Sequence, residues 1–114
     1  MSSPDTRTLI SPQTIERAVA ELLAQTPRGT QVILFGSYAR GDANVESDLD
    51  FLVVQPTLTN RRAEMVRLRS LLRPLKIPAD VLVVSRPAFE AWKVLPNNVI
   101  HDAFMEGKFY GHAS

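Results

Sequence analysis

The strongest constraint in this sequence is a pair of aspartates inside an apolar stretch. Residues 47–55, SDLDFLVVQ, predict a β-strand. Side chains two positions apart in a strand point to the same face, so Asp48 and Asp50 lie side by side, with Leu49 and Phe51 turned toward the core. Two ionised carboxylates about 6 Å apart repel by about 3 kcal/mol at an effective dielectric of about 20. Solvent, a basic partner or a divalent cation is needed to offset that repulsion.

A third acid opens the next apolar run. Asp80 is the second residue of ADVLVVSR, 79–86, which also predicts a strand. If this strand lies beside the strand at 47–55, three carboxylates converge and could hold two metal ions, the arrangement used for in-line phosphoryl transfer. Oxygen ligands without cysteine or histidine suit Mg²⁺ or Mn²⁺. An acid at a strand start often simply reaches solvent, and for Asp80 alone both interpretations stay open.

A glycine and a serine follow the preceding strand directly. QVILF, 31–35, predicts a buried strand, FGS follows it, and YARG has the composition of a short helical turn. Gly36 allows the backbone to approach a ligand closely, and Ser37 offers a hydroxyl and an N–H at a helix start, which suits phosphate. The Gly-Lys-Ser/Thr of a Walker loop is absent. A Gly-Ser pair alone is weak evidence, and it gains weight from the acidic strand behind it.

Taken together, these residues resemble a known signature. GSYARGDANVESDLDFLVV, 36–54, is similar to the motif of the DNA polymerase β-type nucleotidyltransferases, specifically the minimal nucleotidyltransferase (MNT) family. The resemblance extends over nearly the whole chain, including the closing DAFMEGKFY, 102–110. The matching elements are Gly36-Ser37, Ala39-Arg40-Gly41, Ser47-Asp48, Asp50 and Asp80.

The resemblance implies a defined chemistry. Gly36 and Ser37 would hold the triphosphate of ATP, and Asp48, Asp50 and Asp80 would bind two Mg²⁺ ions that activate an acceptor hydroxyl. AMP would pass to that hydroxyl and pyrophosphate would leave. One face of the acidic strand would then belong to the core and the other to a nucleotide.

Arg40 has two interpretations. Within the resemblance it would meet a phosphate. Its sequence neighbours equally favour a salt bridge to an acid such as Asp42 or Glu46.

The acceptor must come from elsewhere, because 114 residues argue for one domain with a single core. Stand-alone MNT proteins resemble the antitoxin of a toxin–antitoxin pair whose toxin is an all-helical HEPN ribonuclease. The implied reaction is AMP transfer to a toxin hydroxyl, in particular a tyrosine. Two alternatives remain: neutralisation of the toxin by binding alone, and transfer to a small molecule such as an antibiotic. The acceptor side would be supplied by a partner chain or an oligomer.

The remaining pattern predicts an α/β (α+β) domain with a small mixed sheet of about three main strands flanked by helices. Residues 1–10 form a polar leader and 11–114 the single nucleotidyltransferase domain. Besides the strands, we expect a helix that begins at Ser11-Pro12 and ends by Pro27, a helix over 60–72, and two short helices broken at Pro96-Asn97, with Gly107 as a C-cap.

Composition limits the other functions. Without cysteine the chain can form neither disulfides nor Cys-based zinc sites. No apolar run is long enough to span a membrane and no signal peptide is evident, so a cytoplasmic protein is expected. The net charge of +1 does not require a nucleic-acid partner.

Two further groups of residues bear on partners. Six cations against one acid, Glu64, on helix 60–76 could form a basic face for RNA or for an acidic partner. A solvated helix face is favoured, and direct nucleic-acid binding is not expected. Trp92 and the nearby phenylalanines are expected to pack in the core. The six cations are Arg61, Arg62, Arg67, Arg69, Arg73 and Lys76.

Overall fold

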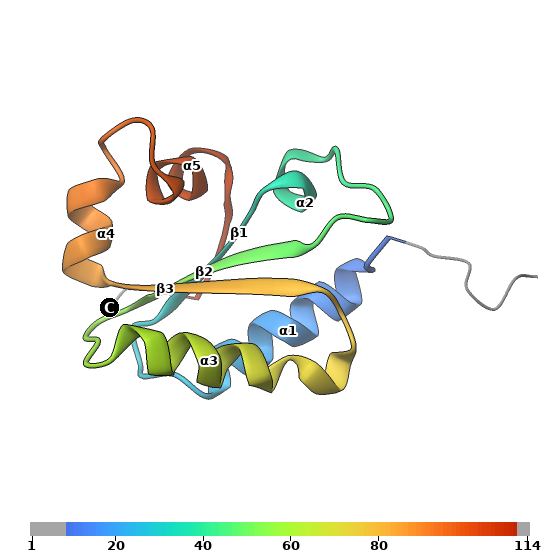
Figure 1. Cartoon of the computed structure of the whole chain (residues 1–114), viewed down its shortest axis with the longest axis horizontal. Coiled ribbons are helices and arrows are strands. Elements are labelled where there is room, and N and C mark those ends of the chain that lie inside the picture. The colour runs from blue at the N-terminus through green and yellow to red at the C-terminus, as the bar shows by residue number, and fades with distance from the viewer. Residues whose placement is uncertain (1–8, 112–114) are drawn as a thin grey trace, which may run out of the picture.

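A computed structural model of the chain describes residues 9–111, so the predicted polar leader lies outside the described residues except for its last two. Helices and strands alternate along the chain (Figure 1). The elements are α1 (Pro12–Ala24), β1 (Gln31–Phe35), α2 (Ser37–Arg40), β2 (Leu49–Gln55), α3 (Arg61–Leu71), the 3₁₀ turn η1 (Arg73–Leu75), β3 (Ala79–Ser85), α4 (Arg86–Trp92), α5 (Val99–Glu106) and β4 (Lys108–Tyr110).

The predicted mixed sheet is confirmed, with one strand added. Its order is β3-β2-β1-β4; β2 and β3 run parallel, and β1 is antiparallel to both β2 and β4. The edge strand β4 was not predicted, because three residues are too few to show a strand pattern. β2 begins at Leu49 instead of residue 47, so Asp48 lies in the loop just before the strand.

Side-chain caps explain where the predicted helices begin. The Ser11 hydroxyl accepts the N–H of Thr14 at the start of α1, and Asn60 and Asn98 cap α3 and α5 in the same way. The break between α4 and α5 is confirmed: Asn97 adopts a left-handed conformation with φ 66°. Gly107 is the C-cap of α5, as expected.

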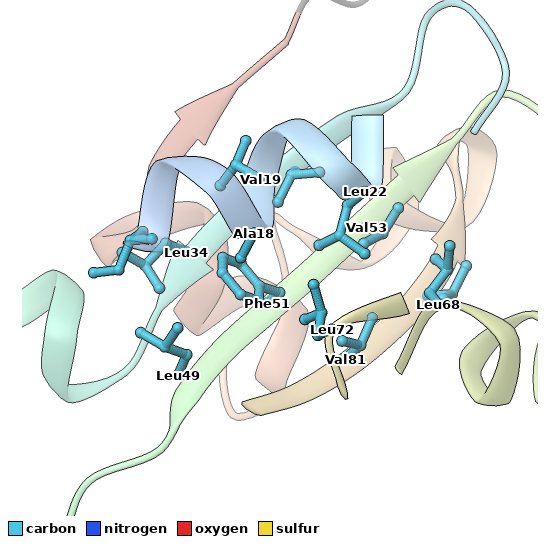
Figure 2. Packing of buried hydrophobic residues seen from close by; sticks show 13 residues of the cluster. Ala18, Val19, Leu22, Leu34, Leu49, Phe51, Val53, Leu68, Leu72 and Val81 are labelled. Atoms are coloured by element: carbon cyan, nitrogen blue, oxygen red, sulfur yellow. The ribbon is translucent and has the colours of Figure 1, made fainter. Parts of the chain in front are cut away.

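One face of the sheet packs against α1 and α3 (Figure 1). Figure 2 shows Ala18, Val19 and Leu22 of α1 against the strands, and Leu68 and Leu72 from the α3 region beside Val81. Phe51 lies at the centre of this layer and is fully buried. Leu49, Phe51 and Val53 thus face the core, as their alternation predicts.

The opposite face of the sheet corrects the prediction that one whole face of the acidic strand belongs to a nucleotide. α4 and α5 cover it (Figure 1), and Leu52 and Val54 of β2 are fully buried there, together with Phe89 of α4 and Ala103 of α5. This is the face of Asp50, since side chains alternate. Most of it is therefore core, and only the beginning of β2 is left for a ligand.

The aromatic residues divide between core and surface. Phe89 is buried as expected, and its ring meets that of Phe104 edge to face at 6.1 Å. Trp92, Phe104 and Phe109 were also expected in the core but are 50%, 36% and 43% exposed. Trp92 is the last residue of α4. Within residues 9–111, no helix is long and apolar enough to cross a membrane.

Candidate functional site

The directions of the strands bring the predicted site residues to one end of the sheet, where β1 ends and β2 and β3 begin. Phe35, at the end of β1, is opposite Asp50, and Asp50 is beside Asp80 of β3 in register. Neighbouring strands lie about 4.8 Å apart, so the two aspartates are adjacent and on the same face. Gly36 follows Phe35 directly and therefore lies at the same end of the sheet.

Gly36 is required at its position for two reasons. Its φ of 79° and ψ of −156° lie in a region that only glycine adopts readily. A Cβ there would also overlap the Asp50 carboxylate. The turn after β1 therefore packs directly against the acidic strand, so the predicted phosphate turn and one predicted metal ligand share one location.

A hydrogen-bonded loop carries Asp48 to this end of the sheet. The Ser47 hydroxyl accepts the Asn44 N–H at 3.0 Å, and the Ser47 N–H donates to the Asn44 carbonyl at 3.0 Å. The Leu49 N–H donates to the Pro78 carbonyl at 2.9 Å, which ties the start of β2 to the start of β3. Asp48 is exposed between these two anchors.

Like charges surround Asp50. Partial burial raises the pKa of its carboxyl above the ordinary value, and the negative charges of Asp80 and Asp48 raise it further, against the opposing charge of Arg40. Its ionised form is therefore disfavoured where it stands. A cation at this end of the sheet would reverse that effect, because it favours the charged carboxylates.

Asp80 is engaged elsewhere in the structure. Its carboxylate lies 3.5 Å from the guanidinium of Arg69 on α3, with both side chains largely exposed. Among residues 9–111, no three acidic or histidine side chains are grouped closely enough to hold a metal ion. The donor set nevertheless fits Mg²⁺, because it consists of carboxylate oxygens on adjacent, in-register strands.

Arg40 forms the salt bridge that one of its two interpretations predicts. Its Nε donates to Asp42 Oδ2 at 3.3 Å, and its Nη1 donates to Glu106 Oε1 at 3.2 Å. These two carboxylates raise the pKa of Arg40, Asp42 first. The same Glu106 oxygen accepts the Gly36 N–H at 3.0 Å.

Glu106 is the site residue that sequence reasoning missed. It ends α5, 70 residues after Gly36, so no local motif connects the two. The only available signal was the similarity of the closing segment 102–110 to the family's C-terminal sequence.

The basic helix is partly explained by contacts within the chain. Arg61 donates to the Val83 carbonyl at 2.7 Å, and Arg67 donates to the Gln25 carbonyl at 2.8 Å and to Glu64. Together with Arg69, three of the six cations have protein acceptors. These contacts give half of the cations on this face partners within the chain.

Comparison with known proteins identifies the class. The nucleotidyltransferase domain family (NTP_transf_2) matches residues 13–104, which include every predicted site residue. The chain belongs to this family. None of the curated protein sequences matches it significantly.

Three solved structures share the fold. A toxin–antitoxin complex with AMP-PNP aligns with a TM-score of 0.59 at 21% identity, covering 84% of this chain and 73% of the other. A proposed nucleotidyltransferase from Sulfolobus solfataricus has a TM-score of 0.56 at 26% identity, covering 69% and 70%. The complex of the MNT antitoxin with tri-AMPylated HEPN toxin from Shewanella oneidensis aligns with a TM-score of 0.54 at 24% identity, covering 87% of this chain and 71% of the other.

Proposed function

We propose that this chain transfers AMP from ATP to a hydroxyl of an all-helical HEPN-type partner, in particular a tyrosine, and thereby acts as an antitoxin. The observation that carries the proposal is the in-register pair Asp50 and Asp80 beside the glycine turn, in a member of the nucleotidyltransferase family. Similarity to an antitoxin bound to an AMPylated HEPN toxin supports the choice of acceptor.

The chain's own residues position the nucleotide. Gly36 allows the triphosphate to approach the backbone, Ser37 supplies a hydroxyl, and Arg40 supplies positive charge beside the turn. Transfer breaks the bond between the α- and β-phosphates and forms an ester bond from the acceptor oxygen to the α-phosphorus. Pyrophosphate leaves, and the proton of the acceptor hydroxyl passes to solvent. Catalysis depends on placing these groups in line, more than on proton transfer by a side chain.

The carboxylates prepare the site for cations. Asp48, Asp50 and Asp80 would hold two Mg²⁺ ions once the Asp80 carboxylate turns from Arg69 toward Asp50. Bound Mg²⁺ neutralises phosphate charge and lowers the pKa of the acceptor hydroxyl. Such neutralisation would favour the ionised form of Asp50, which burial and its acidic neighbours disfavour.

The exposed apolar surface of the chain favours a protein acceptor over a small-molecule acceptor. Seven of the ten large hydrophobic side chains that are exposed within residues 9–111 lie between 92 and 109, in α4, α5, β4 and the intervening loop. Concentrated exposed apolar residues are typical of protein-binding surfaces. They are Trp92, Val94, Leu95, Val99, Phe104, Met105 and Phe109.

The test is transfer of label from ATP to the cognate helical partner in the presence of Mg²⁺. ATP labelled at the α-phosphate should label the partner, and ATP labelled at the γ-phosphate should not. The double variant Asp48→Ala/Asp50→Ala should lose both labelling and neutralisation. Neutralisation that survives this change would support inhibition by binding alone, and label on a small molecule without the partner would support the small-acceptor alternative.

A further inference from the structure

Glu106 occupies donors that a nucleotide phosphate would need. One of its carboxylate oxygens accepts both the Gly36 N–H at 3.0 Å and Arg40 Nη1 at 3.2 Å. Backbone N–H groups and guanidinium groups are the usual protein donors to phosphate oxygens. The carboxylate therefore stands as an anion at the turn to which the proposed function assigns the triphosphate.

Two carboxylates already bind the guanidinium of Arg40. Its Nε is bound by Asp42 at 3.3 Å, and its Nη1 by Glu106. Bidentate binding of a phosphate uses two parallel N–H donors of one guanidinium. A phosphate that binds Arg40 through Nη1 would therefore compete with the Glu106 carboxylate for this group.

The position of Glu106 in α5 argues against a role in helix stability. It is the last residue of the helix, where the helix dipole disfavours negative charge. The backbone behind it is anchored, because the Gly107 N–H donates to the Ala103 carbonyl at 2.9 Å, and Gly107 packs too closely against Ile33 to admit a side chain. The Glu106 side chain is 28% exposed, so it can swing into solvent while the backbone stays in place.

We propose that Glu106 is a built-in competitor for the nucleotide: its carboxylate holds the Gly36 N–H and Arg40 until a phosphate displaces it. This rests on the proposed function for the location of the triphosphate.

The test is the affinity of Glu106→Gln for AMP-PNP with Mg²⁺ and for inorganic triphosphate, both measured by calorimetry without a partner. Glutamine keeps an acceptor oxygen for the Gly36 N–H but loses the charge that holds Arg40. Both ligands should bind about tenfold more tightly, the scale of one charge-assisted hydrogen bond. Adenosine, which has no phosphate, should show no change.

Matched variants separate competition from other effects. Glu106→Asp keeps the charge but shortens the side chain by one methylene, and should also bind triphosphate more tightly than the wild type. Glu90→Gln removes one carboxylate paired with Arg86 and Lys93 on α4, and should leave both affinities unchanged. Unchanged thermal unfolding of Glu106→Gln will confirm that the variant is folded.

The outcomes distinguish this inference from the proposed function. Weaker or unchanged binding of triphosphate by Glu106→Gln would overturn the inference and make Glu106 a support for the turn. Tighter binding of triphosphate without any AMP transfer by the wild type would support the competitor and contradict the proposed function. Binding of neither ligand by either protein would refute both.

Discussion

A carboxylate lies at each end of β2, Asp50 on the strand itself and Glu64 on the neighbouring α3, and the surroundings of the two differ in their effect on the charge. At the C-terminal end, the buried Gln55 donates to Glu64 at 2.6 Å, and Arg67 donates to both oxygens of Glu64. The hydrogen bond from Arg67 is the main reason that the pKa of Glu64 lies below its ordinary value. At the N-terminal end, burial and acidic neighbours raise the pKa of Asp50.

The difference separates a structural acid from a functional one. Glu64 has partners for its charge within the chain, so its ionisation stabilises the fold. Asp50 is surrounded by like charges, so its ionisation opposes folding unless a ligand brings positive charge. A carboxylate kept at a cost to stability, beside a turn that only glycine can form, is typical of a binding site.

The largest expected effect is on catalysis. Asp50→Asn should lower the rate of AMP transfer by more than about 100-fold, because even partners that only support a metal ligand are worth about 10- to 100-fold. Glu64→Gln, on α3 beside the other end of the strand, should transfer AMP at the wild-type rate. Initial rates with α-labelled ATP and the partner provide the measurement. Equal losses in the two variants would remove the distinction between the two ends.

The next largest effect is expected for alanine at Gly36 in the glycine turn, and alanine at Gly41 is the control. Gly41 is left-handed with φ 90°, so alanine there should cost about 1–2 kcal/mol of backbone strain. Gly36, with φ 79° and ψ −156°, lies in a region that only glycine adopts readily, so alanine there should cost at least as much. Only at Gly36 does the new Cβ overlap Asp50; at Gly41 nothing lies within 4 Å. Gly36→Ala should therefore unfold at lower urea and lose transfer activity, while Gly41→Ala shows the strain alone. Equal unfolding free energies in the two variants would argue against the contact with Asp50.

A smaller effect concerns pH. Glu64→Gln should lower the free energy of unfolding by about 1 kcal/mol at pH 7, since it weakens a charge-assisted contact with Arg67. The folded pKa of Glu64 is depressed from 4.5, so this stabilisation is present above pH 4.5 and is lost as the pH falls through the lower folded value. Urea unfolding of both proteins from pH 7 to pH 3 measures the difference. A difference that grows toward low pH would contradict the assignment.

The smallest effect is expected for the pair Arg69 and Asp80. Both side chains are exposed and their charged atoms lie 3.5 Å apart, so Arg69→Ala should change the unfolding free energy by less than about 0.5 kcal/mol. Arg62→Ala on the same helix is the control. A loss of several kcal/mol specific to Arg69→Ala would mean that Asp80 is held as firmly as Glu64 and is not available to a ligand.

Much of the fold could be predicted because its signals are local. Capping residues such as Ser11 and Asn60 mark helix starts, and alternation in β2 marks its buried side chains. β4 could not be predicted, because it is three residues long and depends on pairing with β1. The exposure of Trp92 depends on where α4 ends relative to its neighbours, which composition does not encode.

The candidate site likewise has residues that could be predicted from the sequence and residues that could not. Gly36 and Asp50 belong to one continuous motif, and their convergence follows from antiparallel pairing of neighbouring strands. The register of Asp80 with Asp50 required β2 and β3 to be adjacent, which the sequence only suggested. Glu106 comes from the far end of the chain, and its contact with Gly36 is visible only in three dimensions.

Thermal unfolding with Mg²⁺ and AMP-PNP tests the central claim most directly, namely that the N-terminal end of β2 is arranged for a ligand at the expense of stability. Without ligand, Asp50→Asn should unfold at the same temperature as the wild type or higher, because the variant removes a carboxylate among like charges. With Mg²⁺ and AMP-PNP, the wild type should gain several degrees and the variant almost none. A variant that is less stable without ligand, or equally stabilised with it, would contradict the account.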